Sequence, residues 1–150
     1  PDITLNNKFD HKLKFIDWMV EFFTPQKDKK IIIVGDMNIA PLEHDVWSHK
    51  QLLKIISHTP IEVEKMNALQ KSLNWIDTHR FFIDDSQKLY SWWSYRAKDP
   101  LGANKGRRLD HIWATPNLKS HIKSMKIYQD FRSKTQPSDH VPIETIFDLS

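Results

Sequence analysis

The sequence predicts an α/β protein in which helices cover a β-sheet. Residues 8–23 carry apolar side chains at helical spacing, and the resulting stripe consists of Leu13, Ile16, Val20 and Phe23. Residues 31–34 are apolar and β-branched throughout, a run typical of a buried core strand. A helix followed by such a strand indicates a covered sheet layer, and strand-like segments dominate the second half of the chain.

The remaining segments predict a second long helix and further strands. Thr59 and Glu62 form a capping box around Pro60, so we expect a helix from there to about residue 73. Its expected buried side chains are Ile61, Met66, Leu69 and Leu73. Four more segments are typical of strands, and the expected ranges are 89–95, 109–115, 125–129 and 141–147. A polar loop, residues 96–108, separates the first two of these strands.

Length and composition restrict the classes of function. The 150 residues are enough for one domain, and a net charge of +3 leaves room for an anionic partner. The chain has no cysteine, which excludes a disulfide framework, a thiolate zinc site and a cysteine nucleophile. No apolar run approaches transmembrane length and residues 1–10 lack a signal-peptide pattern, so we expect a cytoplasmic protein with no membrane partner.

Asp36 and Asn38 directly follow the apolar run 31–34 and are the first candidates for chemistry. In an extended segment, residues two apart point to the same side, and both offer the oxygen ligands that Mg²⁺ or Mn²⁺ prefers. The carboxyl end of a core strand is also where open α/β sheets form their ligand crevice. The alternative is a simple turn, because Gly35, Asp36 and Asn38 are all good turn residues.

Asp139, His140 and Asp110 form a second group of candidates. Asp139 and His140 directly precede the apolar strand 141–147, where Asp could bind a metal and His could act as a base or contact a phosphate. A capped loop that happens to contain a histidine is the alternative. Asp110 lies in an apolar strand and needs a partner. We expect His140 to be that partner, because His111 would point to the opposite face of the strand.

Residues 90–96, YSWWSYR, are rich in aromatic side chains. Trp92 and Trp93 are consecutive, so in a strand one enters the core and the other can reach the surface beside Tyr95 and Arg96. Exposed aromatic rings next to arginine can bind bases or sugars, and residues 98–108 add further basic side chains. The alternative is an aromatic core strand followed by a solvated basic loop.

The order of three short motifs resembles that of the endonuclease/exonuclease/phosphatase superfamily. These motifs are GDMN at residues 35–38, RLD at 108–110 and SDH at 138–140. Three details are similar to the exonuclease III, or apurinic/apyrimidinic endonuclease, family: Pro41 after GDMNI, SWWSYR before a basic loop, and PSDHVP near the end. The resemblance runs from about residue 8 to 147. It implies the four-layer α/β sandwich of that superfamily.

The resemblance also implies roles in catalysis. Mg²⁺ or Mn²⁺ would be held by Asp36, Asn38, Asp139 and His140. Asp36 would orient or deprotonate the attacking water, and Asn38 would hold the scissile phosphate. His140, paired with Asp110, would contact the phosphate or act as a base.

On the DNA side, the resemblance implies contacts from Trp92, Tyr95, Arg96, Arg107 and Leu109. Trp92 and Leu109 would line a pocket for the extruded abasic sugar. Arg107 stands where some relatives carry an aromatic residue, so this wall of the pocket departs from the family pattern. Double-stranded DNA with abasic sites or 3′ ends is therefore the expected partner.

The implied activity is that of a bacterial DNA repair nuclease acting in base excision repair. It would hydrolyse the phosphodiester 5′ to an abasic site and trim duplex DNA in the 3′→5′ direction, with a divalent metal. One alternative is a phosphatase of the same superfamily, which would share the three motifs. Another is a non-catalytic module that binds DNA or a protein partner. The aromatic and basic residues of segment 92–108 favour DNA.

The chain contains no motif for the family's N-terminal half, which supplies a glutamate metal ligand, an asparagine and a tyrosine. We therefore expect residues 1–150 to be the C-terminal portion of one domain, with the N-terminal half as the partner that completes a monomeric enzyme. Without that half, an apolar face should be uncovered. Because a metal ligand would also be missing, we expect weak or no activity from these residues alone.

Overall fold

The computed structural model describes residues 7–150. Its α-helices are α1 (Asn7–Phe23), α2 (His49–Leu52), α3 (Pro60–Leu73), α4 (Thr78–Phe82) and α5 (Pro100–Ala103). Its strands are β1 (Ile32–Asp36), β2 (Ile76–Asp77), β3 (Trp92–Trp93), β4 (Gly106–Arg107), β5 (Asp110–Ala114), β6 (Ile122–Ile127) and β7 (Ile143–Phe147). The mixture of helices and sheets confirms the predicted α/β class.

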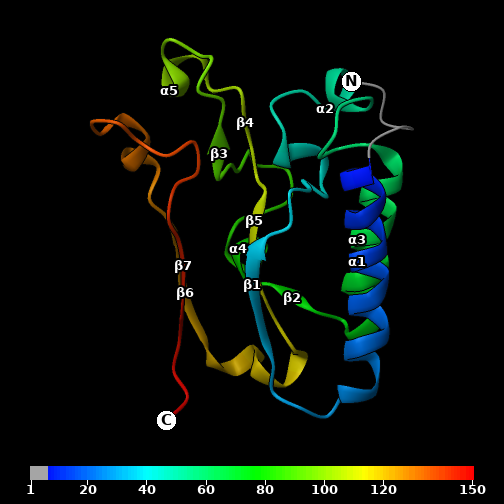
Figure 1. The fold of residues 1–150 in the computed structure, drawn as a ribbon. Helices are drawn as coiled ribbons and strands as arrows, with labels where there is room; N and C mark the ends of the chain where they lie inside the picture. The colour runs from blue at the N-terminus through cyan, green and yellow to red at the C-terminus, as the bar shows by residue number, and fades with distance from the viewer. Residues whose placement is uncertain (1–6) are drawn as a thin grey trace.

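The elements form layers, which Figure 1 shows from the edge of the sheets. The antiparallel pair β6 and β7 is one layer, and the antiparallel sheet with strand order β1-β5-β2 is the next. Helices α1 and α3 cover the other face of that sheet, while β3 and β4 pair near one end of it. No helix among residues 7–150 is long and apolar enough to cross a membrane.

Both long helices form where the sequence predicts them. The capping box at Thr59 and Glu62 is present, and the helix ends at Asn74 in a left-handed conformation with a φ of 54°. The core between the helices and the sheet contains Ile16, Met19, Ile39, Met66, Leu69, Leu73, Trp75 and Trp113. The predicted burial of Ile61 is wrong. Ile61 lies five residues before Met66, which turns it about 140° away from the buried face.

The prediction of a buried strand at residues 31–34 is wrong. Within the described residues β1 pairs with β5 alone, so β1 is an edge of its sheet. Ile33 packs against the core below α1, but Val34 on the opposite face is 70% exposed. A run of β-branched residues indicates a strand and does not determine what covers its second face.

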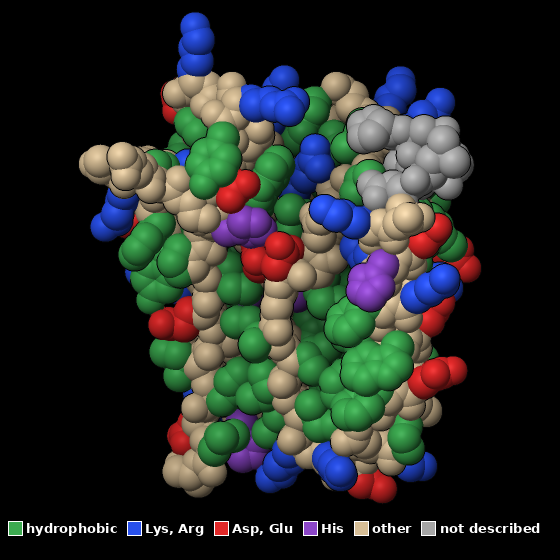
Figure 2. All heavy atoms as spheres, in the orientation of Figure 1, with side chains coloured by type: hydrophobic (Ala, Val, Ile, Leu, Met, Phe, Trp, Pro, Cys, Tyr) green, Lys and Arg blue, Asp and Glu red, His purple; other side chains and the backbone are tan. Residues whose placement is uncertain are grey.

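An apolar face therefore remains exposed on α1 and β1. We define this apolar face by Phe15, Trp18, Phe22, Ile32 and Val34, all of which are exposed. The three aromatic rings stack along α1, with centroid separations of 5.6 and 4.9 Å. Figure 2 shows hydrophobic side chains gathered over α1 and beside the sheet edge on this side of the molecule. The expected uncovered face is thus confirmed for the described part of the chain.

The second half of the chain departs from prediction at its strand ends. β5 matches the predicted strand, whereas β3 spans two residues of the predicted seven, and β6 begins earlier than expected. β3 pairs with β4 at two residues only, because the chain leaves the strand after Trp93 and turns at residues 95–96. The predicted loop 96–108 contains α5 and β4. Asp99 starts that helix by accepting a hydrogen bond from the N–H of Gly102.

A buried ion network ties the segment between β4 and β5 to two other segments. Arg108 is 1% exposed, and its Nε and Nη2 donate to the two carboxylate oxygens of Asp45 at 2.8 and 2.9 Å. Its Nη1 donates to Oδ1 of Asp77 at 2.9 Å, and Arg80 donates to Asp45 at 2.6 Å. Arg108 is therefore a core residue, although the sequence places it in an exposed basic loop.

Protonation of Asp77 should lower the stability of the fold. Burial alone would raise the pKa of Asp77, but the charge and hydrogen bond of Arg108 outweigh burial and lower the pKa to about 2. Because the unfolded pKa is about 3.9, this group contributes about 2 kcal/mol at neutral pH, which is lost as the pH falls toward 2.

We expect Asp77→Asn to remove this pH dependence. In urea denaturation, the difference in unfolding free energy between wild type and variant should be constant above about pH 5 and shrink below about pH 4. Asp130→Asn removes an exposed carboxylate and is the control. A difference for Asp77→Asn that stayed constant down to about pH 3 would contradict the role of the Arg108 pair.

Candidate active site

The candidate site forms where strand β1 ends and its antiparallel neighbour β5 begins. Asp36, the last residue of β1, lies opposite Asp110, the first residue of β5. His140 lies beside β3, because it forms an isolated antiparallel β-bridge with Trp92. One ligand atom from each of Asp36, Asp110 and His140 lies within 4.8 Å of the others. The site thus lies at the end of an antiparallel ladder, not in the crevice of an open α/β sheet that the sequence predicts.

The predicted pairing of Asp110 with His140 is confirmed. Nδ1 of His140 lies 2.8 Å from Oδ2 of Asp110, and Nε2 lies 3.7 Å from Oδ2 of Asp36. Burial alone would lower the pKa of His140, but the hydrogen bond and charge of Asp110, with the charges of Asp36 and Asp139, raise it. His140 therefore holds a proton more readily than a free histidine and can present it from Nε2 beside Asp36.

Two neighbours of Asp110 complete this arrangement. Ser91 Oγ donates to Oδ2 of Asp110 at 2.7 Å and accepts the backbone N–H groups of Leu109 and Asp110. His111 points to the opposite face, as predicted, and its Nε2 lies 2.8 Å from the carbonyl oxygen of Ile39. Sequence reasoning missed Ser91, although it directly precedes the Trp92–Trp93 pair.

Asn38 is brought to the site by a turn. Its backbone is left-handed, with a φ of 50°, and its N–H donates to Oδ1 of Asp36 at 2.8 Å. The extended geometry considered for Asp36 and Asn38 is therefore wrong, and the turn is correct. The turn keeps both residues at the end of β1, so turn formation and a functional role are compatible.

Asp139 is held by the aromatic strand β3. Its Oδ2 accepts a hydrogen bond from Nε1 of Trp92 at 3.0 Å, and its carbonyl oxygen accepts the N–H of Trp93 at 2.9 Å. Trp93 is buried and Trp92 is partly exposed, as the alternation of a strand predicts. The carboxylate of Asp139 is not among the three groups that lie within 4.8 Å of one another.

The residues expected to contact DNA have different environments. Arg107 lies over the ring of Trp92, 5.1 Å from its centroid, and its Nη1 donates to Oγ of Ser57. Leu109 is 4% exposed and packs in the core, so the structure does not bring it to the surface. Tyr95 and Arg96 are exposed, as the sequence predicts for a surface platform.

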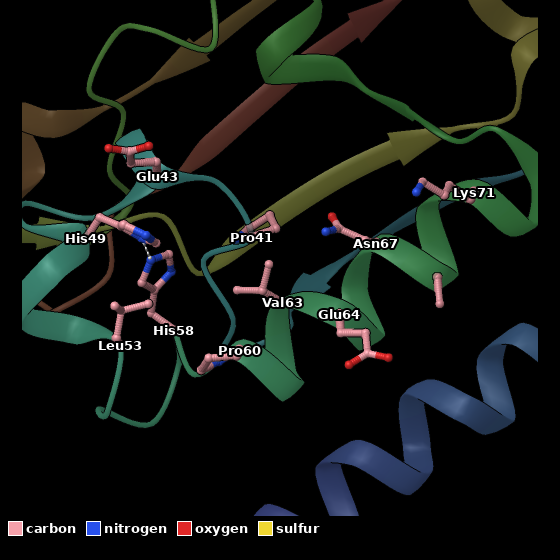
Figure 3. A pocket seen from close by; sticks show the side chains of 11 residues that line it. Pro41, Glu43, His49, Leu53, His58, Pro60, Val63, Glu64, Asn67 and Lys71 are labelled. Carbon is pink, nitrogen blue, oxygen red and sulfur yellow. Dashed lines mark hydrogen bonds between the residues drawn. The ribbon is translucent and has the colours of Figure 1, made fainter.

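A separate hollow of about 590 Å³ lies between α2 and α3. In Figure 3, His49 and His58 point toward one another, and their Nδ1 and Nε2 atoms are 2.7 Å apart. Burial lowers the pKa of His58, and its Nδ1 lies 2.7 Å from the carbonyl oxygen of Ala40. A neutral His58 can donate from Nδ1 to the carbonyl oxygen of Ala40, and its Nε2 then accepts a hydrogen bond from Nδ1 of His49. This pair therefore supports the segment after Asn38.

The donors at the strand ends fit a hard divalent cation. The carboxylate of Asp36 is about half exposed, and its Oδ2 faces His140, while Oδ1 accepts the N–H of Asn38. Carboxylate oxygens suit Mg²⁺ and Mn²⁺. Oδ2 of Asp110 is already shared by His140 and Ser91, which leaves Asp36 as the more available carboxylate.

Comparison with known proteins extends these observations. The sequence model of the endonuclease/exonuclease/phosphatase family matches residues 11–140. The chain is 27% identical over 143 residues to an exodeoxyribonuclease of Bacillus subtilis, covering 95% of this chain and 54% of that protein. It is 31% identical over 147 residues to exodeoxyribonuclease III of Haemophilus influenzae, covering 91% of this chain and 53% of that protein.

Among solved structures, the fold is similar to that of an AP endonuclease from Archaeoglobus fulgidus. The TM-score is 0.88 and the sequence identity 25%, over 96% of this chain and 56% of that chain. The chain thus spans about half the length of the relatives that it matches.

Proposed function

Because this chain belongs to the endonuclease/exonuclease/phosphatase family, we propose that it supplies the C-terminal half of the active site of an exonuclease III-type DNA repair nuclease. The observation that carries this proposal is the group formed by Asp36, His140 and Asp110 at the end of the β1–β5 ladder. A histidine oriented by one carboxylate and facing another is suited to proton transfer at a phosphate ester.

In the proposed reaction, water attacks the phosphodiester 5′ to an abasic site. Asp36 orients this water and accepts its proton, while Asn38 hydrogen-bonds a non-bridging phosphate oxygen. His140 contacts the phosphate from Nε2, and Asp110 holds the imidazole in place through Nδ1. The bond between phosphorus and the 3′ oxygen breaks, and the leaving oxygen takes up a proton from solvent. The products are a 3′-hydroxyl and a 5′-deoxyribose phosphate. The same residues would release nucleotides from the 3′ ends of duplex DNA.

Asp36, Asn38 and Asp139 would hold Mg²⁺ or Mn²⁺ in the complete enzyme. His140, which the resemblance adds to this ligand set, is used in this scheme for the phosphate, because Nδ1 is bound to Asp110 and only Nε2 remains. The bound cation supplies Lewis-acid stabilisation of negative charge on the phosphate. Trp92 has a positioning role in this scheme, since its Nε1 donates to the carboxylate of Asp139.

Aromatic and cationic side chains near the site support DNA as the substrate. Lys134 lies over the ring of Phe131 at 4.6 Å, and both side chains are exposed. Tyr95 is exposed as well, although Arg132, which lies over its ring, is buried. Phe131 and Lys134 also line a hollow of about 490 Å³ that His140 borders. Such pairs bind the backbone phosphates and bases of nucleic acids without reading sequence. The names of the two bacterial relatives, both exodeoxyribonucleases, agree with this choice.

We further propose that an N-terminal half of the same enzyme covers the apolar face of α1 and β1. Two observations support this: the face joins an edge strand to a row of aromatic rings, and the relatives are about twice as long as this chain. Edge strands with apolar neighbours are sites at which further strands add.

The chain without such a cover should self-associate through this face. We expect Trp18→Ser to lower the associated fraction several-fold at micromolar concentration, measured by analytical ultracentrifugation. Phe82→Ser, which changes an exposed aromatic residue on α4 outside this face, is the matched control. Equal association of both variants and wild type would argue against the apolar face as a contact surface.

The proposal is tested by cleavage of a duplex oligonucleotide with one abasic site. The chain is assayed alone and with an N-terminal half supplied, each with Mg²⁺ and with EDTA. We expect strong cleavage 5′ to the lesion with both halves and Mg²⁺, weak or no cleavage by the chain alone, and none with EDTA. Asp139→Ala should abolish the cleavage.

Three outcomes would count against the proposal. Full metal-dependent turnover by the chain alone would show that no second half is needed. Absence of cleavage by folded, associated halves would favour a binding module. Hydrolysis of phosphoinositide or sphingomyelin in a parallel panel, with DNA left intact, would favour the phosphatase alternative.

A further inference from the structure

The turn that carries Asn38 is held from several sides. The N–H of Ala40 donates to the carbonyl oxygen of Ser57 at 2.8 Å, and its own carbonyl oxygen lies 2.7 Å from His58 Nδ1. The carbonyl oxygen of Ile39 lies 2.8 Å from His111 Nε2. These partners come from β5 and from the segment before α3, so the turn is attached to the rigid part of the fold.

Lys12 of α1 holds the carbonyl group of Asn38 itself. Its Nζ donates to the carbonyl oxygen of Asn38 at 3.1 Å and also forms an ion pair with Glu62. The Lys12 side chain is mostly buried, and that of Glu62 is fully buried. Lys12 thus joins α1 and α3 to the one residue of the proposed site that has a left-handed backbone.

Glu62 is a fixed anchor for this lysine. Its carboxylate accepts the backbone N–H groups of Ser57 and Thr59 and the hydroxyl of Thr59, at 2.7–3.1 Å. These bonds cap α3 and do not depend on Lys12. A cation held by such an anchor sets the orientation of the peptide group between Asn38 and Ile39.

We propose that Lys12 is a positioning residue that acts on catalysis through Asn38. The proposal rests on the proposed function, in which the Asn38 side chain contacts the phosphate. A non-glycine residue with a φ of 50° needs its neighbours to hold it in place. Without Lys12, the carbonyl group of Asn38 loses its side-chain partner, so the peptide after Asn38 is less firmly held and the side chain that Asn38 presents to the phosphate can shift. Small displacements of a catalytic group cost up to about 100-fold in rate.

The kinetic test is a double-mutant cycle, measured by abasic-site cleavage with this chain and the N-terminal half both present. We expect Lys12→Met to lower kcat about 10- to 100-fold with little change in KM. Lys12→Arg should restore most of the rate. In an Asn38→Ala background, Lys12→Met should cost less than about 3-fold, because the group it positions is already absent. An equal loss in both backgrounds would show a merely structural role and overturn the proposal.

Lys65→Met is the matched control. Lys65 of α3 forms an ion pair with Asp17 of α1 at 2.8 Å, so this variant removes a contact between the same two helices without touching Asn38. It should leave kcat within about 2-fold of wild type. A loss equal to that of Lys12→Met would assign the effect to helix packing.

Amide hydrogen exchange keeps the proposal testable if no nuclease activity is found. In the chain alone, Lys12→Met should speed exchange of peptides that span residues 36–41 at least several-fold, while peptides from the last turns of α1 and α3, which lie away from Glu62, change little. Unchanged exchange at residues 36–41 would overturn the proposal whatever the enzyme does. Faster exchange without any wild-type cleavage would retain the positioning role and reject the proposed function.

Discussion

Asp110→Asn should lower kcat for abasic-site cleavage by about 1000-fold, with both halves present. The carboxylate holds Nδ1 of His140 at 2.8 Å and stabilises its protonated form. An amide keeps the shape and the hydrogen bond to Ser91 but not the charge, so the pKa of His140 should fall. The rate is measured under single-turnover conditions, and the pKa by NMR titration of the His140 ring in the chain alone.

Asp130→Asn is the control for this prediction, because Asp130 is an exposed carboxylate outside the site. It should leave both the rate and the His140 titration unchanged. A rate loss for Asp110→Asn below about 10-fold would remove Asp110 from the catalytic scheme. An unchanged pKa of His140 would contradict the pairing itself, and this result does not depend on enzyme activity.

Arg108→Met should destabilise the fold by about 3–5 kcal/mol, because it leaves buried carboxylates without a counter-charge. Asp45 is fully buried and receives two hydrogen bonds from Arg108, and Asp77 receives another. For a chain of this size the loss corresponds to a fall in Tm of about 10 °C. Thermal and urea denaturation of the chain alone measure this loss of Tm and of unfolding free energy.

Arg96→Met changes an exposed arginine and should alter stability by less than about 0.5 kcal/mol. If Arg108→Met does not fold, Arg108→Lys retains the charge and should give an intermediate, measurable loss. Similar stability of Arg108→Met and Arg96→Met would mean that the buried network adds little to the fold.

Local signals in the sequence predicted the helices and one pair of site residues. Residues 60–73 form a helix because the capping box at its start and the apolar spacing along it act within a few turns. The pairing of Asp110 with His140 followed from a simple requirement, that a carboxylate in an apolar strand needs a partner. Strand alternation also predicted correctly which of Trp92 and Trp93 enters the core.

Other features depend on contacts between distant segments. Arg107 and Arg108 are adjacent, yet one lies half-buried over the ring of Trp92 and the other is fully buried between Asp45 and Asp77. Ser91 and Lys12 showed no signal in the sequence, because each contacts the site from an element far away along the chain.

The sequence by itself determined the family and the long helices, and it indicated the candidate residues for hydrolysis of a phosphate ester. Periodicity, caps and short motifs are properties of neighbouring residues, so they can be observed in one dimension. Only the tertiary structure decided that β1 is an exposed edge, that antiparallel register brings Asp36 to Asp110, and that Asn38 lies in a turn. Burial and register depend on which distant segments pack together, and the pattern of a single segment does not contain that information.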